Sequence, residues 1–173
     1  MAADIGGIFE AEMTKVFTQL KTTHLLGWHR LVDTAAAGNT VSSQPSDYLL
    51  GLPAGSTSPL DNQRLMFVEI KASEKHHTLG KAMMRPSQRG AIGYYRYLLN
   101  IPYLVLFWDA TDGVMQLWDG LAIHGEKNID KRHILATWQN VGVNNRLRTD
   151  HVAQLMSDYF KIPLASATLA KVR

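Results

Sequence analysis

The stretch LMFVEIKA, residues 65–72, is the clearest strand of this sequence, and it decides the fold. Side chains alternate between the two faces of a strand. Glu69 and Lys71 therefore share one face, while Val68 and Ile70 share the other. The period-two pattern predicts a strand that holds a carboxylate and an ammonium group side by side.

The segments on either side of this strand have helical or strand patterns of their own. Apolar periodicity and turn residues predict helices at 8–24, from Pro86 to about Leu99 and from Thr149, and strands at 28–32, 48–52, 103–108 and 114–118. This order predicts an α/β fold with a central mixed β-sheet flanked by helices. We expect Leu98 and Leu99 to share the apolar face of the second helix with Ile92.

Composition favours one folded domain. The chain has 173 residues, of which 46% are hydrophobic and 19% charged, so it can bury a substantial core. We expect one domain over 1–173, with a core at about 7–118 and a helical extension at about 121–173. No stretch approaches the length of a membrane span. The absence of cysteine, and of a secretion signal at 1–7, is typical of a cytoplasmic protein.

The charge is unevenly distributed. The net charge is only +3, but six basic residues against the single acid Glu74 lie between residues 71 and 97: Lys71, Lys75, Lys81, Arg85, Arg89 and Arg96. A second basic cluster spans 127–148. Such clusters contact phosphates in nucleic-acid-binding proteins, although a solvated surface explains either one equally well.

Two acidic motifs lie 22 residues apart and suggest a metal site. Asp47 follows Pro45-Ser46, and Glu69 lies in the central strand. Two carboxylates and the carbonyl oxygen of Ile70 would give Mg²⁺ the oxygen ligands that it prefers. Lys71 would hold the attacking water or stabilise developing charge. Taken alone, Asp47 is typical of a turn, and an acid and a lysine two residues apart are typical of an exposed pair.

Four short motifs in this order resemble a known family. They are GIFE at 7–10, QPSDY at 44–48, FVEIKAS at 67–73 and RPSQ at 85–88, and the apolar strand at 103–108 follows them. Together they are similar to the PD-(D/E)XK nucleases, the restriction-endonuclease-like superfamily. Within it, the chain most resembles Holliday junction resolvases of the archaeal and RecU kinds. The likeness covers about 7–118, and Ser46 is an additional residue between the proline and the aspartate.

The resemblance implies a restriction-endonuclease-like core and a metal-dependent DNA endonuclease that uses Mg²⁺, with Mn²⁺ as an alternative. It implies catalytic roles for Glu10, Asp47, Glu69, Lys71 and Gln88. Metal would be held by Asp47, Glu69, the carbonyl of Ile70 and, directly or through water, Glu10. Gln88 would position the attacking water, although a capping side chain in the first helical turn explains it too. Resolvases act as dimers, which implies a homodimer.

Further residues are candidates for DNA contacts. They follow or flank the central strand: Ser73, Lys75, Lys81, Arg85 and Arg89. His29 and Arg30 are candidates to line the cleft, although a half-exposed strand explains them equally well.

Other functions stay open on the sequence alone. One is restriction, repair or end processing by a nuclease of the same fold. Another is a DNA-binding module that has lost catalysis, which the intact Asp47, Glu69 and Lys71 argue against. A third is a structural or assembly protein with a coincidental acid cluster, which predicts neither metal binding nor salt-dependent affinity for DNA. A nuclease this small is compatible with a phage or mobile-element origin, and then with the host cytoplasm.

Overall fold

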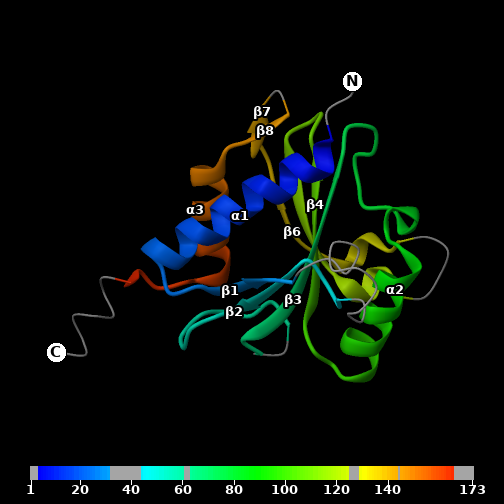
Figure 1. Cartoon of the computed structure of the whole chain (residues 1–173), viewed down its shortest axis with the longest axis horizontal. Helices are drawn as coiled ribbons and strands as arrows, with labels where there is room; N and C mark the ends of the chain where they lie inside the picture. Colours follow the sequence, from blue (N-terminus) through cyan, green and yellow to red (C-terminus); the bar gives the residue numbers. More distant parts are fainter. Residues whose placement is uncertain (1–3, 32–43, 61–62, 125–128, 144, 166–173) are drawn as a thin grey trace.

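The protein has an α/β fold built on a six-stranded sheet, as the order of predicted elements indicated (Figure 1). The structure is a computed structural model that describes residues 4–31, 44–60, 63–124, 129–143 and 145–165. The helices and strands are α1 (Ile5–Thr23), β1 (Gly27–Arg30), β2 (Tyr48–Gly51), β3 (Leu65–Ser73), α2 (Pro86–Ile92), β4 (Tyr103–Asp109), β5 (Val114–Asp119), β6 (Ile134–Trp138), β7 (Gly142–Val143), β8 (Arg146–Leu147) and α3 (Thr149–Phe160).

The sheet is mixed, and its strands lie in sequence order from β1 to β6. Strands β3 and β4 are parallel, whereas the other four neighbouring pairs are antiparallel. A parallel pair needs a crossover connection. Here the chain from β3 to β4 passes through α2, which places that helix directly beside the strand carrying Glu69 and Lys71.

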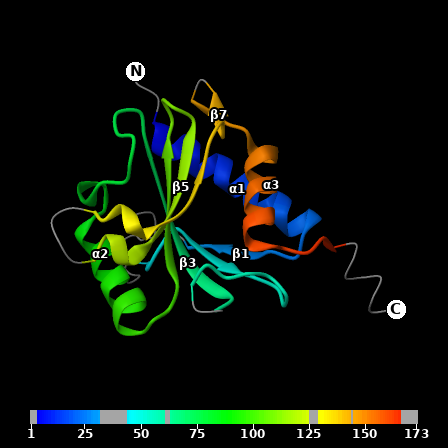
Figure 2. The same ribbon diagram turned by 180° about the vertical axis from the view of Figure 1, so that it is seen from behind.

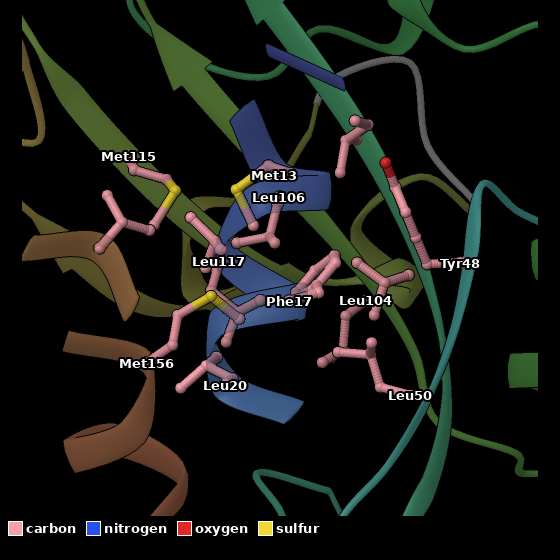
Figure 3. Packing of buried hydrophobic residues seen from close by; sticks show 14 of the residues in the cluster. Met13, Phe17, Leu20, Tyr48, Leu50, Leu104, Leu106, Met115, Leu117 and Met156 are labelled. Atoms are coloured by element: carbon pink, nitrogen blue, oxygen red, sulfur yellow. The ribbon is translucent and has the colours of Figure 1, made fainter. Parts of the chain in front are cut away.

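Helices cover both faces of the sheet, so there are two hydrophobic cores. Figures 1 and 2 show α1 and α3 on one side of the sheet and α2 on the other. On the first side, Met13, Phe17 and Leu20 of α1 pack against strand residues such as Leu106 (Figure 3). On the second side, a smaller cluster forms around Ile92 and β4. Glu69 and Lys71 lie on this second face, as the alternation along β3 predicted.

The helix predicted from Pro86 to about Leu99 changes its geometry at Ile92. The chain continues as the π-helical segment η2 (Gly93–Leu98), and Leu99 N–H donates to the carbonyl of Tyr94. A π-helical turn is wider than an α-turn, so the residues after it are rotated about the helix axis. Arg96 is buried as a result, while Leu98 is 67% exposed and Leu99 49%. The expectation that both leucines share the buried face was therefore wrong.

The C-terminal part contains more than the helix we expected. The last helix, α3, begins at Thr149 as predicted, but its N-cap is Arg148, and no side chain caps it. Strand β6 joins the main sheet beside β5, and β7 and β8 form a separate hairpin. The expectation of a wholly helical extension missed β6 because this strand lies at the edge of the sheet and is only half-buried, which weakens the alternation.

Two of the expectations fall on residues that the structure does not describe. Val32, the predicted end of the first strand, and Lys127 of the second basic cluster lie outside the described residues. None of the helices that the structure describes combines the length and the apolar character needed to cross a membrane.

Candidate functional site

The site forms where the sheet opens between β2 and β3. The ladder between these strands runs only from Gly51 opposite Leu65 to Tyr48 opposite Val68. Beyond Val68 this pairing stops, and none of the strands that the structure describes pairs with β3 on this side. The side chain of Asp47, the residue before β2, replaces a strand partner at this point, because its Oδ2 accepts a hydrogen bond of 2.8 Å from the backbone N–H of Ile70. The side chain of Asp47 is thereby held against the strand that carries Glu69.

A polar cleft of about 250 Å³ lies at this opening. Charged residues of both signs line it: Glu10, Asp47, Glu69, Arg30 and Arg85. Gln88 also faces it, so four of the five predicted catalytic residues meet in one place. Lys71 reaches the site through Glu69, because its Nζ lies 2.5 Å from Oε1 of that carboxylate. The structure thus brings together residues that span almost eighty positions of the chain.

Glu69 has too little positive charge around it for a buried carboxylate. It is wholly buried. Burial and, after it, the facing carboxylate of Asp47 raise the pKa of its carboxyl to about 7, although Lys71 opposes both effects. Two close carboxylates with one ammonium group attract a cation.

Gln88 caps the first turn of α2, as one interpretation had it, and it also contacts Glu69, whereas its role in positioning the attacking water stays a prediction. It is 7% exposed, and its Nε2 donates to Oε1 of Glu69. Its Oε1 accepts from the backbone N–H of Arg85 at 2.9 Å, which caps the first turn of α2. The cap fixes the amide, so that the amide can hold one oxygen of Glu69 in place.

Glu10 lines the cleft, but its carboxylate forms an ion pair with Arg30 and does not group with the carboxylates of Asp47 and Glu69. Among the described residues, Glu10, Asp47 and Glu69 do not form a group with carboxylate oxygens all within 4.8 Å of one another. The turn of α1 that carries Glu10 is attached to β2, since the hydroxyl of Tyr48 donates to the Glu10 carbonyl at 3.1 Å. The separation of the Glu10 carboxylate from those of Asp47 and Glu69 favours the version of the prediction in which Glu10 acts through water.

The remaining donors at the opening fit a hard divalent cation. In a strand, the N–H and C=O of one residue point to the same side. Because Ile70 N–H points to Asp47, the Ile70 carbonyl also points toward this side rather than toward β4. Asp47, Glu69 and this carbonyl form an all-oxygen set, which suits Mg²⁺ or Mn²⁺, and the excess negative charge at Glu69 favours a cation.

The predicted DNA-contacting residues are spread more widely. Arg85 lines the cleft, and Lys75 is exposed in the loop after β3. Ser73 is 7% exposed, and its hydroxyl accepts the N–H groups of Lys75 and His76 at 3.0 and 2.9 Å. Ser73 therefore stabilises the loop, and its burial argues against a contact with DNA.

The other candidates for DNA contacts have mixed environments. Lys81 and Arg89 are partly buried, and Arg89 points a nitrogen toward the Met84 carbonyl, 3.4 Å away. Arg30 lines the cleft as one of our two interpretations had it, whereas His29 is exposed on β1 and does not line it. The contacts of Lys75, Lys81, Arg85 and Arg89 with DNA stay predictions.

A second group of possible metal ligands lies at the far end of β3 and was not predicted. Nδ1 of His77 is 2.8 Å from Asp109 and 3.0 Å from Asp112. The Asp109 carboxylate raises the pKa of His77. Asp109 also accepts the N–H groups of Thr111 and Asp112, so a turn explains its burial. The sequence spacing of His77, Asp109 and Asp112 gave no indication that these three residues lie together.

Comparisons with known proteins give a likeness to a solved structure. No protein-family model matches this chain, and no curated protein matches it. Among solved structures, the chain is similar to Hjc, a Holliday junction resolvase from the archaeal hyperthermophile Archaeoglobus fulgidus. The TM-score is 0.42 and the sequence identity 13%, over 74% of this chain and 92% of Hjc. A likeness of this size does not establish a shared activity, which has to be argued from the site itself.

Proposed function

We propose that this protein is a metal-dependent DNA endonuclease that hydrolyses phosphodiester bonds, with the nuclease activity in one domain. The observation that carries the proposal is Glu69. It is a buried carboxylate that faces Asp47 and lines a cleft with arginines at its edge. A cation held by Asp47, Glu69 and the Ile70 carbonyl would neutralise this charge and would polarise a phosphate ester.

The side chains around the carboxylates supply the other requirements of the reaction. Lys71 donates from Nζ to Glu69, and from this position it can hold the attacking water or stabilise the developing negative charge. Gln88 fixes one oxygen of Glu69 and so orients the carboxylate. Arg30 and Arg85 carry positive charge at the cleft, where a DNA backbone would run past the carboxylates. Glu10 orders water at the site.

The proposed substrate is branched DNA, and the proposed activity is that of a Holliday junction resolvase. This part rests on the order of the motifs at 7–10, 44–48, 67–73 and 85–88. A four-way junction needs two symmetric cuts, so the proposed active form is a homodimer that works in DNA recombination and repair in the cytoplasm.

The test is cleavage of a labelled four-way junction and of its linear duplex arms, with Mg²⁺ or with EDTA. The variants are Glu69→Ala and, as a matched control, Glu12→Ala, which removes a half-buried acid of α1 that pairs with Lys15 and does not line the cleft. Paired metal-dependent cuts in the junction alone, lost in Glu69→Ala and kept in Glu12→Ala, support a resolvase. Cutting of both substrates indicates a nuclease for restriction, repair or end processing. Binding with no cutting indicates a DNA-binding module.

A further inference from the structure

Tyr103 touches both halves of the proposed metal site. It is the first residue of β4 and is wholly buried. Its hydroxyl donates a hydrogen bond of 2.6 Å to the carbonyl oxygen of Pro45, two residues before Asp47. The same hydroxyl oxygen lies 3.5 Å from Oε2 of Glu69. One side chain thus contacts the segment that carries Asp47 and the carboxylate that faces it.

The sheet register explains this position. Strands β3 and β4 are parallel, and Tyr103 is the partner of Phe67. Side chains of paired residues lie on the same face, so Tyr103, Phe67 and Glu69 all lie on the face that α2 covers. The rings of Phe67 and Tyr103 are 6.0 Å apart. The phenol therefore extends along β3 toward Glu69 rather than across the sheet.

We propose that Tyr103 is a positioning residue of this metal site, which sets the separation of Asp47 from Glu69. The proposal rests on the proposed function, because it gives a role to a residue beside that same site. Tyr103 touches neither the cleft nor a substrate, so it would act through the two carboxylates. Residues that orient metal ligands commonly change metal affinity 10- to 100-fold when their hydrogen bonds are removed.

A neutral hydroxyl suits this role better than a charged group. Burial raises the pKa of Tyr103 well above its ordinary value, and Glu69 and Asp47 raise it further, so the phenol stays protonated. A lysine or an arginine at this position would neutralise Glu69 and would compete with a cation. The hydroxyl orients the carboxylates and leaves their negative charge available.

The ring of Tyr103 is wholly buried in the hydrophobic cluster around Ile92 and β4. Gly120, which follows β5, packs directly on it. A side-chain carbon at Gly120 would lie 2.8 Å from the Tyr103 carbonyl oxygen and 3.3 Å from ring atom Cδ1. Close packing of this kind keeps a side chain in one rotamer. The position of the hydroxyl is therefore fixed before any ligand binds.

The test compares Tyr103→Phe with Tyr159→Phe as a matched control. Both substitutions remove only a hydroxyl, and Tyr159 bonds the Leu135 carbonyl at 3.4 Å, away from the cleft. Titration calorimetry with Mn²⁺ and no DNA measures the affinity for metal. We expect Tyr103→Phe to bind Mn²⁺ about 10-fold more weakly and Tyr159→Phe to bind it as the unmodified protein does. Saturating Mn²⁺ should restore most of the kcat of Tyr103→Phe, and its affinity for DNA in EDTA should be unchanged.

Three outcomes would overturn the proposal, and they are distinct. Equal Mn²⁺ affinity in all three proteins overturns the role of Tyr103 and leaves the proposed nuclease intact. No metal binding by the unmodified protein overturns both. An equal loss of affinity in Tyr159→Phe shows that any lost hydroxyl weakens the fold, and then Tyr103 has no special role.

A measurement on the unmodified protein keeps the test valid even if Tyr103→Phe does not fold. The hydroxyl proton of Tyr103 should exchange slowly with water and show a nuclear Overhauser effect to Pro45 or Ser46. A rapidly exchanging hydroxyl without this contact contradicts the proposal.

Discussion

Two buried carboxylates of this protein, Glu69 on β3 and Asp119 at the end of β5, have opposite surroundings. Asp119 receives two bonds from the guanidinium of Arg96, at 2.9 and 3.0 Å, and a third from the Leu121 N–H at 3.0 Å. Glu69 receives Lys71 and Gln88 on a single oxygen and faces Asp47 with the rest of its charge. Both acids are buried to a similar degree.

The two acids differ in their balance of charge rather than in burial, and we propose that this balance separates a structural acid from a functional one. A buried carboxylate with a bidentate arginine is satisfied and has no capacity for a further cation. A buried carboxylate beside a second carboxylate is destabilised until a cation arrives. Glu69 is of the second kind and Asp119 of the first. The predictions that follow test this distinction, in order of decreasing expected effect.

Glu69→Gln should have the largest effect on activity. The substitution keeps the size of the side chain but removes the charge that would hold a metal. We expect cleavage to fall by about 10³-fold, equivalent to about 4 kcal/mol, while the protein stays folded. Single-turnover cleavage with Mg²⁺ and urea unfolding measure the two quantities. Retained cleavage would show that Glu69 is a buried acid without function.

Asp119→Asn should have the opposite profile. It leaves the buried guanidinium of Arg96 without its ion pair, so the free energy of unfolding should fall by about 3 kcal/mol. Cleavage per folded molecule should change little. The control is Asp130→Asn, because Asp130 pairs with Arg132 at the surface, where such a pair contributes little. Equal stability of both variants would contradict the structural role of Asp119.

The raised pKa of Glu69 predicts how stability depends on pH without metal. The pKa rises from 4.5 in the unfolded chain to about 7 in the folded protein. The folded protein therefore binds more protons between these values, and its stability falls as the pH rises from about 4.5 to about 7. The shift corresponds to roughly 3 kcal/mol. Urea unfolding across this range measures the slope.

Glu69→Gln and added Mg²⁺ are the controls for this pH dependence. The fall in stability should be absent in Glu69→Gln, because an amide does not titrate. Mg²⁺ binding below pH 7 should release a proton, since the carboxylate must be ionised to act as a ligand. A pH profile that is the same in both proteins would place the titrating group elsewhere.

Gln88→Ala should have a smaller effect on both activity and stability. It removes the bond to Glu69 and the cap on the first turn of α2. We expect the free energy of unfolding to fall by about 1–2 kcal/mol and cleavage to fall by about 10-fold. Gln154→Ala, which removes an exposed glutamine bonded to Asp158, is the matched control and should change neither.

Arg30→Gln should have the smallest effect. The exposed ion pair with Glu10 contributes under about 1 kcal/mol to stability. If Arg30 contacts a phosphate, the slope of log affinity for DNA against log salt should decrease by about 0.9. Arg132→Gln, at an exposed position away from the cleft, should leave that slope unchanged. An equal slope in both variants means that Arg30 serves only to pair with Glu10.

Most of the sheet could be predicted from the sequence because local residue patterns are enough to indicate its strands. The alternation along 65–72 and the apolar run at 103–108 do not depend on distant residues, and both strands lie within a residue of their predicted ends. Strand β6 and the π-helical segment η2 could not be predicted in this way. The first depends on a place at the edge of the sheet, and the second buries Arg96 against Asp119, which lies 23 positions further along the chain.

Five catalytic residues were proposed from the sequence, and four of them line one cleft while Lys71 reaches it through Glu69. For Arg30, a place in the cleft was one of two equally good interpretations of the sequence. Tyr103 was not singled out. Tyrosine at the start of an apolar strand is typical of a core residue, and only the distance from its hydroxyl to Pro45 shows another role. Sequence spacing carries no signal for such a contact, because the two residues are 58 positions apart.

The sequence by itself determined which residues can carry the chemistry. Alternation placed Glu69 and Lys71 on one face, and the proline before a helical segment placed Gln88 in its first turn. Only the tertiary structure decided which charged groups surround each acid. Asp119 meets Arg96, Glu69 meets Asp47, and Glu10 meets Arg30 because strands and helices far apart in the chain pack together. Local patterns select residue types, whereas the electrostatic balance of a buried site is a property of the whole fold.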